Sequence, residues 1–107
     1  MKLRYLQQAL AEGRYELSGH ALVMMTGRNV GLDDLISAVA WGQVLEVNPD
    51  AKPFPTTLVS GPTAVSGEAI HVVFSRPAGA DRVTVVTVYY PDELLWHKAK
   101  IRKRKPR

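Results

Sequence analysis

Two histidines, an arginine and a tyrosine are the side chains of this chain best suited to proton transfer on a phosphodiester. Cleavage of RNA by its own 2′-hydroxyl needs a base for that proton, an acid for the leaving 5′-oxygen and cations for the phosphorane charge. Histidine titrates near neutral pH, so it suits both proton steps. His20, His71 and Tyr89 are the candidates for these steps, and Arg28 is a candidate cation. The residue types therefore favour metal-independent endoribonuclease chemistry.

Each of these residues also has a structural interpretation. His20 can simply help a short helix to pack, and Arg28 in a turn can be a solvated charge. His71 stands in the middle of an apolar strand, so it needs a hydrogen-bond partner, either as a core histidine or as a functional group on an open sheet face. Tyr89 can pack at the rim of the core rather than meet a ligand. Both interpretations stay open from the sequence.

Half of the positive charge lies in the last ten residues, 98–107, which we call the basic segment. It holds seven of the fourteen Lys and Arg and sums to +7, whereas residues 1–97 hold the other seven with all ten Asp and Glu and sum to −3. Neutralising phosphates releases condensed counterions, so this density of charge attracts polyanions, although such a segment can also be a merely solubilising end. RNA or another nucleic acid is the predicted partner. The predicted contacts are Lys98, Lys100, Arg102, Lys103, Arg104 and Lys105.

Length and composition predict a single domain over residues 1–97, followed by the basic segment as a tail. A chain of 107 residues buries roughly two-thirds of its unfolded surface, and its 46% hydrophobic and 22% charged residues are typical of globular proteins. It contains no cysteine, which excludes disulfides, thiolate zinc sites and cysteine nucleophiles. A reducing compartment, the cytoplasm, is the expected location.

The motifs of several large function classes are missing from the sequence. It has no G-x-x-x-x-G-K-[ST], G-x-G-x-x-G, H-E-x-x-H or G-x-S-x-G pattern, and its three histidines lack the spacing of metal ligands. No signal-peptide core forms at the N-terminus, and the longest uncharged run, residues 53–67, is broken by Pro and Gly. We therefore expect no cofactor, no metal and no membrane contact.

Three segments before residue 43 have apolar residues at helical spacing. The first predicted helix covers 2–12, the second follows Ser18 as N-cap and stops at Gly27, and the third begins at Leu32 and is closed by Gly42.

From residue 43 onward the period changes to 2, and β-branched and aromatic residues are separated by Pro and Gly clusters. This pattern predicts four strands, at 43–48, 56–60, 68–75 and 82–90. Helices followed by strands indicate an α+β domain, with two or three N-terminal helices packed on one face of a mostly antiparallel four-stranded sheet. In the strand at 68–75, alternation places His71 opposite the helix-facing core.

Short motifs along the chain together resemble a small bacterial domain family of unknown function. They are Ser18-x-His20-Ala21, Arg28-x-Val30 before a helix ending in Gly42, Ile70-His71-Val72-Val73, and Thr87-Val88-Tyr89-Tyr90-Pro91-Asp92 followed by Trp96. The resemblance covers about residues 14–102. Members of this family look related to bacterial ribonuclease toxins of the RelE and BrnT type. The resemblance implies a RelE-like fold, with His20, Arg28, His71 and Tyr89 as the matching polar positions.

One position departs from the family pattern. Relatives usually have an arginine four residues after the first histidine, where this chain has Met24. The change removes a cation, so either catalysis is weakened or the fold persists without it.

The leading hypothesis from the sequence is a toxin-like, metal-independent endoribonuclease domain of a bacterial toxin–antitoxin system. Its substrate would be RNA, and an acidic antitoxin protein is a further candidate partner. The alternative is a non-catalytic module that binds nucleic acid or another protein.

Overall fold

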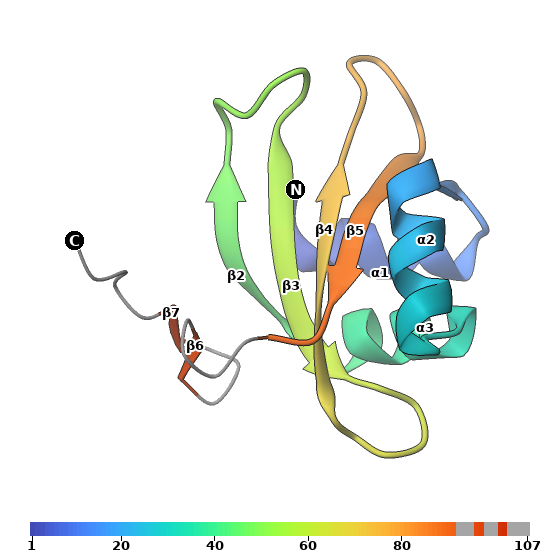
Figure 1. Ribbon diagram of the computed structural model, residues 1–107. Helices are drawn as coiled ribbons and strands as arrows, with labels where there is room; N and C mark the ends of the chain where they lie inside the picture. The colour runs from blue at the N-terminus through green and yellow to red at the C-terminus, as the bar shows by residue number, and fades with distance from the viewer. Residues whose placement is uncertain (92–95, 98–100, 103–107) are drawn as a thin grey trace.

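The computed structural model describes residues 1–91, 96–97 and 101–102. This part of the chain contains three helices, a five-stranded sheet and a two-stranded sheet (Figure 1). In chain order the elements are α1 (Leu3–Ala11), β1 (Tyr15–Leu17), α2 (Gly19–Arg28), α3 (Leu32–Ala40), β2 (Gln43–Asn48), β3 (Thr56–Pro62), β4 (Ala69–Ser75), β5 (Val83–Tyr89), β6 (Trp96–His97) and β7 (Ile101–Arg102).

Local signals in the sequence account for the helix ends. The Ser18 side-chain oxygen accepts a hydrogen bond from the backbone N–H of Ala21 at 2.9 Å, which confirms the predicted N-cap of α2. Gly13, just beyond α1, has φ +74°, the left-handed conformation that glycine adopts without strain. α2 runs one residue past the predicted stop at Gly27, because Asn29 with φ 56° provides the left-handed end instead.

The large sheet differs from the predicted one. Its strand order is β1-β5-β4-β3-β2, and β1 pairs parallel to β5 while the other neighbours are antiparallel. The predicted number of four strands was therefore wrong, since the sheet has five strands and is mixed, although most of its pairings are antiparallel as predicted. β1 was missed because three residues are too few to show alternation. Backbone hydrogen bonds from Val83 to Arg14 and from Ser18 to Val85 hold it in place.

The three helices supply one side of the core, as predicted. On β4, the side chains of Ile70, Val72 and Phe74 are fully buried in a cluster that also contains Leu6 of α1 and Leu35 of α3. At roughly 25 cal/mol per Å² of apolar surface, each large side chain in this cluster contributes about 1.5–3 kcal/mol.

The strand pairing gives the sheet two distinct ends. Gln43 pairs with Ser60, Pro62 with Ala69 and His71 with Tyr89. The start of β2, the end of β3, the start of β4 and the end of β5 therefore meet at one end, which we call the exit end because the chain leaves the sheet there. Figure 1 shows the β3–β4 connection at this end and the β2–β3 and β4–β5 connections at the other.

Candidate functional site

His71 and Tyr89 are neighbours on adjacent strands. They are paired in the β4–β5 register, and their ring centroids lie 5.3 Å apart in an edge-to-face arrangement with an interplanar angle of 64°. Both lie on the face opposite the helices, because Ile70 and Val72 on either side of His71 belong to the core. The predicted face of His71 is thus confirmed, and two candidate proton-transfer groups come together.

This face is covered around His71. The imidazole is 0% exposed, and its neighbours across β3, Ser60 and Leu58, are 4% and 6% exposed. Tyr89 is only half-buried. A substrate could therefore reach Tyr89 but not His71 in this conformation, so His71 can act through Tyr89 by fixing its ring.

His20 and Arg28 do not join this pair. Both are exposed and belong to α2, whose Ala21 and Met25 pack into the core on the helix side of the sheet. Eight residues of helix separate them by roughly 12 Å along the axis. The Arg28 guanidinium donates a hydrogen bond to the Met24 sulfur at 3.3 Å. Met24, which stands where relatives have an arginine, thus contacts the candidate cation Arg28 on the helix side of the sheet, whereas His71 lies on the other face.

The predicted nucleic-acid contacts fall largely outside the described residues. Of Arg102, the structure describes only the backbone in β7, which pairs with β6. The residues outside the description are Lys98, Lys100, Lys103, Arg104 and Lys105. Their role stays a prediction, as does the boundary at residue 97. The structure does define where the chain leaves the large sheet before the basic segment, because β5 ends at the exit end.

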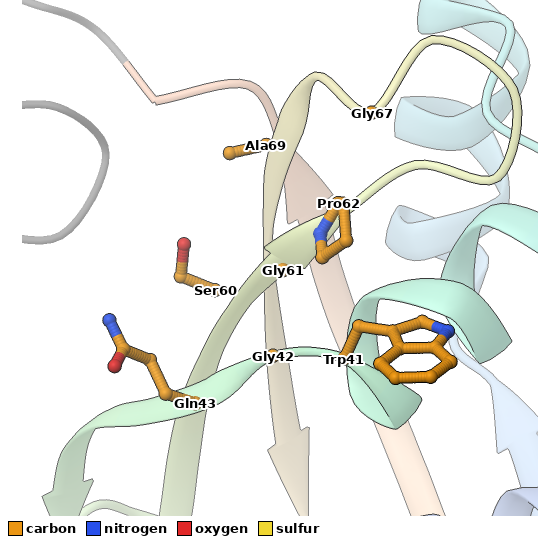
Figure 2. Close-up of a pocket in the computed structure, with 8 residues that line it drawn as sticks. All are labelled: Trp41, Gly42, Gln43, Ser60, Gly61, Pro62, Gly67 and Ala69. Carbon is orange, nitrogen blue, oxygen red and sulfur yellow. The ribbon is translucent and has the colours of Figure 1, made fainter.

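A hollow of about 290 Å³ lies at the exit end. It is lined by Trp41, Gly42, Gln43, Ser60, Gly61, Pro62, Gly67 and Ala69. Figure 2 shows the Trp41 indole and the Pro62 ring on the same side, while Gln43 and Ser60 point away from the indole. The Trp41 side chain is 80% exposed. Sequence reasoning missed this residue, although a tryptophan immediately after a helix and off its apolar stripe was an available signal.

Two glycines bring α3 against the strands and so place Trp41. A Cβ on Gly61 would overlap the carbonyl oxygen of Ala38 and lie 2.7 Å from its Cα. A Cβ on Gly42 would overlap the same oxygen and that of Ser60. The end of α3 therefore sits directly on β3, and Trp41 follows at the edge of the hollow.

The opposite end of the sheet carries a cluster of arginines with a structural role. Arg14 Nε donates a hydrogen bond to Glu12 at 2.7 Å, which holds the pKa of that carboxyl below its ordinary value. Arg14 also donates to the backbone carbonyl of Asp81, and the Arg76 guanidinium lies 4.6 Å from the centre of the Tyr5 ring. These contacts tie α1 to the β4–β5 turn.

No metal site is evident among the described residues, where no three His, Asp or Glu side chains gather closely enough to hold an ion. Nor does that part of the chain include a helix with the length and apolar character needed to cross a membrane.

Comparison with models of known protein families assigns most of the chain to one family. Residues 17–90, from the end of β1 to the end of β5, match the family model described as Domain of unknown function (DUF4258). The chain belongs to the DUF4258 family. The expectation of a small family of unknown function is thereby confirmed. The DUF4258 match includes Trp41 as well as His20, Arg28, His71 and Tyr89. No curated protein and no solved structure matches the chain, so the relation to RelE and BrnT toxins stays a prediction.

Proposed function

We propose that this DUF4258 domain binds RNA, with the basic segment as its main electrostatic contact. The observation that carries the proposal is the separation of charge, +7 in residues 98–107 against −3 in residues 1–97. Seven like charges in ten residues repel one another unless a polyanion or counterions neutralise them. The backbone of a nucleic acid carries one negative charge on each phosphate, so one bound strand can neutralise several of these basic side chains. The cytoplasm, where RNA is abundant, is the proposed location.

The geometry favours binding over cleavage. Transesterification needs a base, an acid and a cation around one phosphate. The described residues bring only His71 and Tyr89 together, with His71 buried, while His20 and Arg28 are on α2. Binding requires no such convergence, because phosphate contacts are additive along a strand.

A charge-neutralised variant of the full chain tests the proposal. Six basic residues, Lys98, Lys100, Arg102, Lys103, Arg104 and Lys105, are replaced by glutamine, and the affinity for a labelled single-stranded RNA is measured by fluorescence anisotropy. We expect a loss of at least about 100-fold at low salt, since each phosphate contact contributes to counterion release. The control is Lys52→Gln with Arg82→Gln, two exposed basic residues at the opposite end of the sheet. If the control loses as much RNA affinity per removed charge as the six-glutamine variant, the basic segment is not the main electrostatic contact.

A second candidate function is metal-independent RNA cleavage, and the 5.3 Å contact between the rings of His71 and Tyr89 favours it. Tyr89 would meet the scissile phosphate, and His71 would position it. In this case an acidic antitoxin is the proposed protein partner. Cleavage is tested with purified protein and EDTA present, comparing Tyr89→Phe, His71→Ala and a 2′-deoxy substrate. Cutting that persists in Tyr89→Phe or on the 2′-deoxy substrate would exclude this mechanism.

His20 and Arg28 are tested in the same assay. Because they lie on the helix side of the sheet, His20→Ala and Arg28→Ala should leave any cleavage within about threefold of the native rate, whereas a residue in the reaction typically contributes 100-fold or more. A loss of that size would show that α2 takes part.

A further inference from the structure

Among the Phe, Tyr and Trp side chains of residues 1–91, Trp41 is the only exposed one, with 80% of its surface accessible. Tryptophan carries a large apolar surface that is usually covered, either in the core or by a ligand. Here the close packing at Gly42 and Gly61 fixes the backbone at the end of α3, so the exposed indole projects from a defined place on the domain. An exposed indole is suited to stacking.

We infer that Trp41 is a stacking platform for one unpaired nucleobase, which occupies the hollow beside the indole and the Pro62 ring. The volume of about 290 Å³ admits a single base. Stacking on an indole tolerates every base, so the site selects single strands over duplexes rather than a sequence. The inference rests on the proposed RNA binding and specifies where a base is held.

The surroundings favour a nucleotide over an apolar peptide. None of the eight residues that line the hollow is charged, so nothing in its lining repels the phosphates on either side of a base. The hollow also lies at the exit end, where Tyr89 ends β5 and the chain continues toward the basic segment. In the sequence the basic segment follows β5, so the chain leads to it from the end of the sheet that presents Trp41.

The test uses the full chain and a short single-stranded RNA of mixed sequence. Trp41→Ala should weaken binding by roughly 5- to 100-fold, the usual range for one base–aromatic stack, whereas Trp41→Phe should stay within a few-fold of the native affinity. The slope of affinity against salt should not change in either variant, because stacking releases no counterions. Val65→Ala is the matched control, since Val65 is 95% exposed and does not line the hollow. It should bind as the native chain does.

A direct readout comes from fluorescence. In a Trp96→Phe variant, Trp41 is the remaining tryptophan. Its emission should be quenched as RNA is added, and replacing the bases of the oligonucleotide by abasic positions should abolish the quenching while phosphate binding persists. Unchanged thermal melting of Trp41→Ala establishes that the variant folds.

Different failures have different meanings. If the native chain binds RNA and Trp41→Ala binds it with equal affinity, the stacking site is overturned and the proposed function stays intact. The stacking site is also overturned if Trp41→Ala loses as much affinity for duplex RNA as for single-stranded RNA. It is likewise overturned if RNA does not quench the Trp41 emission in Trp96→Phe. If the native chain does not bind RNA at all, the proposed function fails and this inference fails with it.

Discussion

Replacing Gly61 by alanine should strongly destabilise the domain. The new methyl group would overlap the carbonyl group of Ala38 and lie 2.7 Å from the Ala38 Cα. These are backbone atoms, so no rotamer change can relieve the overlap. α3 would have to move away from β3, and the buried side chains of Leu35 and Val39 would lose their packing against the sheet.

The magnitude follows from what must move. Overpacking that flexible side chains can absorb costs about 1–3 kcal/mol. Here a helix must shift against a sheet, so we expect the upper end of that range, about 3 kcal/mol or more, in the free energy of unfolding. For a domain of this size, such a loss lowers Tm by roughly 12–24 °C.

Thermal and urea denaturation followed by circular dichroism measure the change. Gly27→Ala is the matched control, because a Cβ there meets nothing within 4 Å and alanine is favoured in a helix. This variant should be more stable by about 0.5–1 kcal/mol. If Gly61→Ala unfolds within about 1 kcal/mol of the native chain, the close contact of α3 and β3 is wrong, and the placement of Trp41 that depends on it is wrong too.

Three further predictions concern single contacts. Ser18→Ala removes the α2 cap and a 2.8 Å hydrogen bond to a β5 carbonyl, and should lower the free energy of unfolding by about 1–2 kcal/mol in urea denaturation. Asp34→Ala should lower it by about 1–3 kcal/mol, because its carboxylate accepts 2.9 Å hydrogen bonds from the N–H groups of Gly31 and of a residue in the β3–β4 loop; native stability in this variant would refute that link. Arg14→Gln should raise the pKa of Glu12 toward its ordinary value in a carbon-detected NMR titration. Since the folded pKa of Glu12 is lowered, the pair stabilises the native chain above the unfolded pKa, and this contribution is lost as the pH falls through the folded pKa.

Residues with strong local signals were predictable from the sequence. Ser18 and Gly13 specify helix ends through their own backbone and side-chain geometry, and the alternation around His71 specifies its face. β1 was not predictable, because a three-residue strand is stabilised by pairing with distant β5 rather than by its own pattern.

The candidate site was less predictable, because it depends on contacts between distant parts of the chain. The contact of His71 with Tyr89 comes from the β4–β5 register, and the separation of Arg28 from them comes from the side of the sheet on which α2 packs. The order of the motifs along the sequence shows neither this contact nor this separation. The exposure of Trp41 depends on Gly61, twenty residues later, which lets α3 lie directly on β3.

The salt dependence of RNA binding tests the central claim most directly. The affinity of the native chain for a single-stranded oligonucleotide is measured between ~50 and ~200 mM monovalent salt. Five to seven phosphate contacts predict a slope of about −3.5 to −5 in log K against log salt, a loss of roughly 100- to 1,000-fold across that range. The variant with six glutamines in the basic segment should have a slope close to zero. No binding by the native chain at ~50 mM salt, or an unchanged slope in the variant, would contradict the account.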